Sequence, residues 1–216
     1  MGEASNIRRY EGRGCSVTYD AKRCIHAAEC VRGLPAVFDS KAKPWIRPAE
    51  TEADVLAPVI ERCPSGALKL ERADGTSEPV PTRNTATLTR DGPTYLRGDV
   101  ELVGADGTVA MIDTRMALCR CGASQNKPLC DGSHRAAGFR HPGTVLAGET
   151  PPSVPAGRRL TIRQRPNGPL MCTGPLSVVG TDGRAAYAES TFLCRCGGSA
   201  NKPYCDGTHR RIGFST

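Results

Sequence analysis

The sequence lacks the signatures of several common classes of protein. It contains no dinucleotide-binding G-x-G-x-x-G fingerprint, no phosphate-binding G-x-x-x-x-G-K-[ST] loop and no recognisable Ser/His/Asp array, so we expect no enzymatic activity. No apolar run approaches the roughly 18 residues that a membrane-spanning helix needs. The N-terminal stretch MGEASNIRRYEGRG is too polar for a secretory segment. These absences predict a cytoplasmic protein that does not associate with a membrane.

Aromatic residues are scarce, and the charge is diffuse. The 216 residues include only ten aromatics, and the net charge of +7 is carried by basic residues that never occur in runs longer than two. Neither a base-stacking platform nor a phosphate-binding stripe is visible, so we expect no binding of nucleic acid. The apolar content of 38% is low for one large core and favours several small units, each stabilised by more than hydrophobic burial.

The eleven cysteines are the conspicuous feature that the chain does have. In a reducing compartment, clustered cysteines are metal ligands or redox groups more often than disulfides, and an odd number argues against complete pairing. The pattern C-x-C-x8-C-x3-H occurs twice, and three cysteines with one histidine at this spacing predict a metal centre in each copy. The ligands of the two centres are Cys119, Cys121, Cys130 and His134, and then Cys194, Cys196, Cys205 and His209.

The two ligand patterns belong to an internal repeat. A shift of 76 residues aligns GPTYLRGDVELVGADG (92–107) with GPLMCTGPLSVVGTDG (168–183), and a shift of 75 aligns the ligand patterns. Each repeat predicts short strands, a D-G turn and a ligand loop that leads into a short helix. Stretches rich in Pro, Gly, Ser and Thr predict linkers at 73–84 and 141–157. We therefore predict three domains, with the bounds 1–72, 85–140 and 158–216.

Two further pairs of residues occupy matching positions in the ligand loops. Asp131 and Asp206 begin the final turn of each loop, and we expect each to be a helix N-cap whose carboxylate accepts a hydrogen bond from a backbone amide two or three residues later. Lys127 and Lys202 precede prolines at matching positions of the two loops. Each lysine either lies near the metal centre, where it would bind and tune a cofactor, or is a solvated loop residue.

The spacing alone leaves the metal open, because three cysteines and one histidine also suit a structural zinc site. The longer string C-x-C-x2-S-x3-P-x-C-D-G-[ST]-H, which includes Ser124, Pro128, Ser199 and Pro203, resembles the CDGSH iron-sulfur (NEET) family. The resemblance implies one [2Fe-2S] cluster in each copy and a β-sandwich whose tandem modules are related by an internal pseudo-twofold axis. It also implies a monomer, because one chain supplies what single-motif relatives build from two.

The segment before the repeat contains RCIHAAECVRGLP and, further along, RCPSGAL. In the bacterial ferredoxin run C-x2-C-x2-C-x3-C-P, three cysteines and a distant Cys-Pro serve one cluster. Here Cys24 and Cys30 hold the first and third positions, while Ala27 and Leu34 replace the second and fourth cysteines. Cys63 is followed by proline and supplies the distant ligand.

With VFDSKAKPWI and CPSGAL, residues 16–72 resemble the divergent single-cluster ferredoxin domain, which implies a ferredoxin-like α+β fold. Three cysteines suffice for a [3Fe-4S] cluster, whereas a [4Fe-4S] cluster needs a fourth ligand; His26 either supplies it or forms a hydrogen bond nearby. Cys15 is another possible ligand, but it lies in the strand-like stretch CSVTY, where we expect it to pack. We expect Cys172 to behave as a small apolar residue and Trp45 to belong to a core rather than to conduct electrons.

Three clusters on one small chain favour a multi-cluster electron carrier that exchanges electrons with redox partner proteins. One alternative is a cluster-transfer or redox- and pH-sensing protein that passes labile clusters to apo-acceptor proteins, and another is an interaction module stabilised by zinc. Imidazole titrates near neutral pH and makes a cluster one charge unit less negative than a fourth thiolate would. His134 and His209 are therefore candidate release switches.

Overall fold

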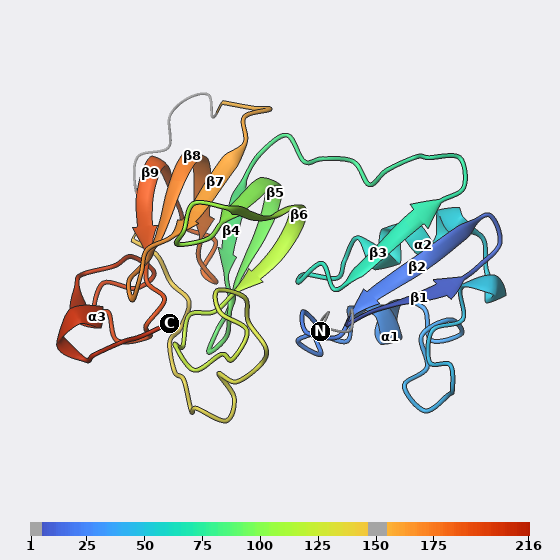
Figure 1. Cartoon of the computed structure of the whole chain (residues 1–216), viewed down its shortest axis with the longest axis horizontal. Helices are drawn as coiled ribbons and strands as arrows, with labels where there is room; N and C mark the ends of the chain where they lie inside the picture. The colour runs from blue at the N-terminus through green and yellow to red at the C-terminus, as the bar shows by residue number, and fades with distance from the viewer. Residues whose placement is uncertain (1–5, 147–154) are drawn as a thin grey trace. The chain divides into compact units, whose positions relative to one another are not determined.

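The computed structural model describes residues 6–146 and 155–216, and the chain divides into two compact units, Met1–Pro79 and Val80–Thr216 (Figure 1). Residues 147–154 of the predicted linker 141–157 lie outside the described residues, as do residues 1–5. Most regular structure in the described chain is β-strand, with a few short helices, which agrees with the predicted α+β class. Among these residues, no helix is both long and apolar enough to cross a bilayer.

The first unit is built on a three-stranded antiparallel sheet. Its strands lie in chain order and are β1 (Ile7–Glu11), β2 (Cys15–Asp20) and β3 (Leu68–Arg72). The helical segments are α1 (Glu29–Gly33), the 3-10 turn η1 (Pro48–Glu50) and α2 (Ala53–Ile60). These elements surround one small hydrophobic core.

Helix α2 contributes much of that core because its apolar residues recur at helical spacing. Leu56, Val59 and Ile60 share one face and are buried in the same cluster as Val17 of β2 and Leu68 of β3. The helix thus packs its apolar face on the sheet, and the loops that carry the cysteines of this unit are anchored to a fixed framework.

Two residues of this unit lie where the sequence predicted. Cys15 begins β2 and is 7% exposed, so it is a packed strand residue. Trp45 is partly buried against the core, with its ring edge-on to Tyr19 at a centroid separation of 4.9 Å and near Phe38.

The second unit is a six-stranded sheet made from both repeats. The first repeat supplies β4 (Thr85–Leu88), β5 (Thr94–Val103) and β6 (Val109–Leu118). The second supplies β7 (Leu160–Gln164), β8 (Leu170–Val179) and β9 (Ala185–Leu193). The predicted D-G turns join β5 to β6 and β8 to β9, and their glycines, Gly107 and Gly183, have the positive φ angles that such turns need.

The first strand of each repeat pairs with both repeats. β4 pairs antiparallel with β5 of its own repeat and parallel with β8 of the other, while β7 pairs antiparallel with β8 and parallel with β5. The buried Asn84 adds to this pairing between the repeats. Its side-chain amide donates to the carbonyl oxygens of Arg158 and Pro175 in the second repeat, at 2.8 and 3.0 Å. Neither repeat can therefore complete its backbone hydrogen bonds without the other.

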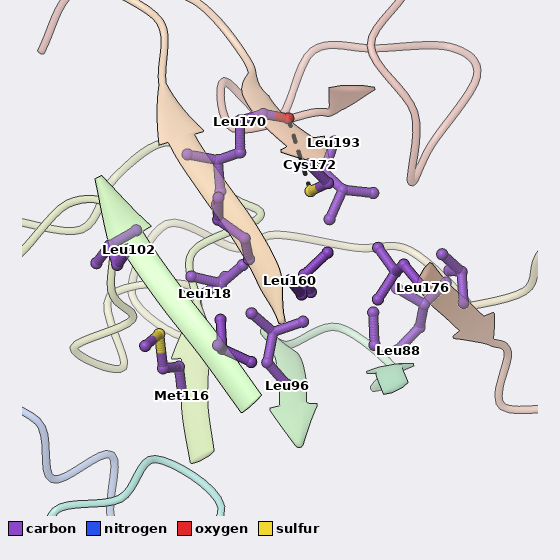
Figure 2. Packing of buried hydrophobic residues seen from close by; sticks show 14 of the residues in the cluster. Leu88, Leu96, Leu102, Met116, Leu118, Leu160, Leu170, Cys172, Leu176 and Leu193 are labelled. Atoms are coloured by element: carbon purple, nitrogen blue, oxygen red, sulfur yellow. Dashed lines mark hydrogen bonds between the residues drawn. The ribbon is translucent and has the colours of Figure 1, made fainter. Parts of the chain in front are cut away.

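Leucines from both repeats form one core between these strands (Figure 2). Leu96 and Leu118 of the first repeat and Leu160 and Leu176 of the second are each no more than 1% exposed. Cys172 is 1% exposed in the same core, and its thiol donates a hydrogen bond to the carbonyl oxygen of Leu170 at 3.9 Å. It is a small core residue, as the sequence predicted.

Candidate metal centres

Each ligand loop brings its four predicted ligands together as two pairs. In the first loop, the Sγ atoms of Cys119 and Cys121 lie 3.6 Å apart, and Cys130 Sγ lies 3.5 Å from His134 Nδ1. The corresponding distances in the second loop are 3.7 and 3.4 Å. A tetrahedral metal with bonds of about 2.3 Å to sulfur and about 2.0 Å to nitrogen separates two such ligands by roughly 3.5 to 3.8 Å, so each pair fits one metal ion.

The backbone of each loop explains how residues far apart in the pattern meet. The amide of Cys119 donates to the carbonyl oxygen of Pro128 at 2.9 Å, and the amide of Cys130 donates to that of Ala117 at 2.8 Å. The second loop makes the equivalent bonds at 2.8 Å. The C-x-C segment and the third cysteine are therefore held side by side as a short antiparallel bridge. In the described residues, no three His, Cys, Asp or Glu side chains are grouped to hold a single ion.

Backbone amides also point at the sulfur atoms. The amides of Ala123 and Gly132 donate to the sulfurs of Cys121 and Cys130 at 3.4 Å, and the second loop repeats both contacts at the same distance. The Cys121 thiol lowers the pKa of Cys119 to about 6 by donating to its sulfur, while burial raises the pKa of Cys130 to about 11. The loops thus offer partial positive charge to thiolates, which is what an anionic metal centre requires.

The aspartates accept the predicted amide hydrogen bonds, but the N-cap prediction was wrong for Asp206, because Gly207 holds the N-cap position of the short helix that follows. Asp206 accepts hydrogen bonds from the amides of Thr208 at 3.0 Å and Ala200 at 2.8 Å, and Asp131 accepts the equivalent pair in the first loop. The amide bonds hold the pKa of Asp206 well below its usual range, so its carboxylate stays ionised. The predicted short helix forms only in the second repeat, as α3 (Thr208–Arg211); the first loop ends in hydrogen-bonded turns instead.

Each predicted lysine has a partner within its own loop. The ammonium group of Lys127 donates to the carbonyl oxygen of Ser124 at 2.7 Å, and Lys202 donates to that of Ser199. Lys127 also lies 6.0 Å from the ring centroid of Phe214 in the second repeat. These contacts fix the loop conformation, and a direct role of the lysines in cofactor binding stays a prediction.

Two buried arginines belong to the ligand loops, and the sequence analysis did not identify them as part of the sites. Arg120 and Arg195 lie between the paired cysteines and are 4% and 1% exposed. Arg195 donates to the carbonyl oxygens of Gly168 at 3.0 Å and Arg165 at 2.9 Å, and its guanidinium lies 5.6 Å from the ring of Phe214. Arg120 makes the corresponding contacts in the first repeat. The sequence does contain a pattern that could have identified these arginines, because the C-R-C triplet and a later G-F dipeptide recur at matching positions of the two repeats.

The two ligand loops lie at the same end of the six-stranded sheet and touch (Figure 1). Gly122 packs against the carbonyl group of Cys196, and Gly197 packs against that of Cys121. Both glycines have φ near 80°. The backbone segments that carry the C-x-C ligands are therefore in direct contact across the two repeats.

The two centres differ in accessibility. Cys130 and His134 are buried, at 2% and 8% exposed, and burial together with the charge of Arg135 lowers the pKa of His134. Their counterparts Cys205 and His209 are only partly buried and line an open cavity of about 760 Å³. The second centre is thus the more accessible of the two.

In the first unit, the three predicted cysteines line one small cavity. Cys24, Cys30 and Cys63 are all partly buried there, together with His26 and with Ala27 at the position of the missing cysteine. Burial raises the pKa of Cys30, and the charges of Cys63 and Cys24 add to this effect. Three sulfurs around one space fit the predicted single-cluster site, and His26 is near enough to line it.

The loop that carries Cys24 is held in a tight conformation. His26 and Ala28 have φ angles of 55° and 63°, which non-glycine residues adopt only when the surroundings impose them. The buried Arg23 donates two hydrogen bonds to the carbonyl oxygen of Ser65, at 3.1 and 2.7 Å. This links the Cys24 loop to the loop that follows Cys63.

Comparison with known proteins identifies both units. Residues 10–73 match a family model described as a divergent 4Fe-4S mono-cluster, and residues 91–135 and 167–210 match the iron-binding zinc finger of CDGSH type. The chain is also 44% identical over 62 residues to the uncharacterized protein YjdI of Escherichia coli strain K12, a match that spans 29% of this chain and 82% of that protein. The YjdI protein of Escherichia coli O157:H7 gives the same values.

Proposed function

Because the chain belongs to the iron-binding CDGSH family, with two CDGSH domains behind a divergent 4Fe-4S mono-cluster domain, we propose that it is a multi-cluster electron carrier. Its iron-sulfur domains are those that the sequence predicted. The proposal has three parts: the clusters that the domains hold, the arrangement of the repeats, and the reaction they serve.

We assign one [2Fe-2S] cluster to each ligand loop. The support is the division of the ligands into a pair of cysteines and a Cys-His pair, each with the separation that one metal ion needs. The N-terminal cysteines would hold one [3Fe-4S] cluster, or a [4Fe-4S] cluster if His26 is a ligand. When bound, such clusters accept and return single electrons, and the protein supplies the amide donors around their sulfur ligands.

We further infer that the repeats form a β-sandwich with an internal pseudo-twofold axis and act as a monomer. The reciprocal pairing of β4 with β8 and of β7 with β5 supports this arrangement, because each repeat donates the equivalent strand to the other. A second chain is then not needed to complete the fold.

The observation that carries electron transfer is the contact between the ligand loops. Gly122 and Gly197 allow the two C-x-C segments to touch, so the loops that carry the two centres are in direct contact. Electron transfer slows steeply with distance, and a fixed short separation favours exchange between centres. We propose no substrate chemistry, and we propose redox proteins as partners.

The test is anaerobic purification of the full chain, followed by iron and sulfide counts, paramagnetic resonance spectra and a reversible redox titration. The electron-carrier proposal expects each cluster to take up and release one electron with full recovery of the visible spectrum. Irreversible bleaching during one cycle, or stoichiometric zinc in place of iron, would contradict it.

Cluster transfer is the second candidate, and the accessibility of Cys205 and His209 favours it. A transfer protein would pass a cluster from its second loop to an apo-ferredoxin within minutes and keep the buried first cluster. A carrier would retain both clusters in the same mixture, so the iron content of the repurified chain separates the two functions.

A further inference from the structure

The open cavity beside the second centre has a distinct chemical character. We call it the second-centre groove, and it combines exposed cations, aromatic rings and two metal ligands. The residues that define it are Arg165, Arg210, Phe192, Phe214, Cys205 and His209. A molecule seated in this groove would contact the ligands of the second centre directly.

The charge of the two repeats differs although their ligand loops match. Residues 158–216 contain nine lysines and arginines against three aspartates and glutamates, a net charge of +6. Residues 85–140 contain seven against six, a net charge of +1. The positive charge of the second unit is therefore concentrated on the repeat that carries the groove.

The groove itself has two exposed arginines without an acidic partner. In the described part of the chain, neither Arg165 nor Arg210 takes part in an ion pair, and both are exposed. The first repeat has Thr89 at the position of Arg165 and the matching Arg135 at the position of Arg210. The cation at Arg165 is thus an addition of the second repeat.

One of the two aromatic residues of the groove, Phe192, is also specific to the second repeat. Phe192 is 45% exposed, whereas its counterpart in the first repeat, Ala117, is 2% exposed. A large exposed aromatic next to free arginines is the combination that dominates binding energy at protein interfaces. It has no evident role in the core of this sheet.

We propose that the second-centre groove docks an acidic surface of a redox partner protein, so that electrons enter or leave the chain through the second centre. This inference rests on the electron-carrier function and names the partner surface for it. The net charge of the repeat would steer the acidic partner, Arg165 and Arg210 would pair with its carboxylates, and Phe192 would supply apolar contact.

Nucleic acid is the other polyanion that such charge attracts, and the groove favours it less. Its cations are two separate arginines at a concave site rather than a stripe that follows a phosphate backbone. Its two phenylalanines line a cavity together with two metal ligands rather than an open stacking surface. A carboxylate-bearing protein surface matches this arrangement better.

The experiment measures binding of a fluorescein-labelled glutamate-rich peptide to the cluster-loaded full chain by fluorescence anisotropy. Arg210→Glu should weaken binding by about tenfold or more, and Phe192→Ala, which restores the residue of the first repeat, by about fivefold. The matched control is Arg135→Glu, which makes the same charge change at the equivalent position of the first repeat and should alter binding less than about twofold. Binding should also weaken as salt is raised.

Three outcomes would overturn the docking proposal: no binding of the peptide, equal loss in Arg210→Glu and Arg135→Glu, or tighter binding of a single-stranded DNA oligonucleotide through the same arginines. A redox titration of the same samples is read separately. If the chain is reduced and reoxidised reversibly but does not bind the peptide, the electron-carrier function stands and the docking site is refuted. A chain that binds the peptide through the groove but cannot be cycled keeps the acidic docking site and loses the electron-carrier function, and with it the passage of electrons through the groove.

Discussion

Gly122 of the first ligand loop lies so close to Cys196 of the second that a Cβ atom on the glycine would come within 2.5 Å of the cysteine's carbonyl oxygen. The same relationship holds between Gly197 and Cys121. Since Cys121 and Cys196 are themselves predicted ligands, the contact joins the backbones of the two centres. A substitution in one loop should therefore also alter the stability of the centre in the other loop.

The first prediction tests this contact with Gly122→Ala. The new methyl group would clash with a backbone oxygen and would also need a positive φ of 80°, so we expect the unfolding free energy to fall by about 2 kcal/mol or more. We also expect faster loss of visible absorbance from both centres, although only the first loop is changed. Thermal unfolding of the cluster-loaded chain and the decay of each cluster's spectrum provide the measurements.

Gly138→Ala is the matched control for Gly122→Ala. Gly138 has a φ of 61° but open space around its Cβ position, so this change adds backbone strain without a clash and should cost about 1 kcal/mol. Equal effects of the two substitutions would show that strain alone matters and that the loops are not coupled through the contact.

The second prediction concerns the buried arginine of the second loop. Arg195→Gln removes a guanidinium that serves two carbonyl groups and the Phe214 ring. The buried carbonyl oxygen of Gly168 loses this donor, whereas that of Arg165 keeps the backbone amide of Gly168 at 3.0 Å. We expect the unfolding free energy to fall by about 3 kcal/mol. Chemical denaturation, with the unfolding of each unit monitored separately, measures this change. Arg184→Gln is the control: its ion pair with Asp182 is at the surface, and its loss should cost less than about 0.5 kcal/mol.

The third prediction addresses the N-terminal unit. Cys63→Ser should abolish the cluster of that unit and leave the iron of the two CDGSH domains in place, because Cys63 lines the cavity with Cys24 and Cys30. Iron and sulfide counts with paramagnetic resonance spectra report the change. Cys15→Ser is the control, since this buried strand cysteine is not at the cavity and its loss should cost stability but no iron. Unchanged iron in Cys63→Ser would show that the unit holds no cluster through this residue.

His26 allows a sharper version of the same experiment. If the imidazole is a ligand, His26→Ala should shift the N-terminal resonance signal to that of a three-iron cluster. If it only lines the cavity, the signal should stay as in the parent protein, and the assignment of a fourth ligand to His26 would fail.

The fourth prediction concerns acid. A protonated imidazole cannot bind iron, whereas iron-bound thiolates resist protonation near neutral pH, so cluster loss should grow as the pH falls through about 6. Because His209 is more exposed than His134, the second centre should lose its cluster first. His209→Cys should slow acid loss at the second centre and His134→Cys at the first, and each should lower the reduction potential of its own cluster. Equal decay of visible absorbance at pH about 6 in the parent and both variants would refute control by histidine.

The sequence by itself determined the features that depend on short spacing. The two ligand patterns, the D-G turns at Gly107 and Gly183 and the aspartate braces each involve residues a few positions apart, and a local backbone geometry follows from them. The family resemblance rested on the same local strings, and it was confirmed.

Only the tertiary structure decided how the repeats combine. The pairing of β4 with β8 and the contact of Gly122 with Cys196 join residues more than 70 positions apart. The buried position of Arg195 depends on hydrogen-bond partners 21 to 31 positions away. The same is true of the exposure of His209 against the burial of His134, although their local sequences are nearly identical. Local sequence sets which hydrogen bonds and turns a segment can form, but burial and charge at a site are set by every element packed against it.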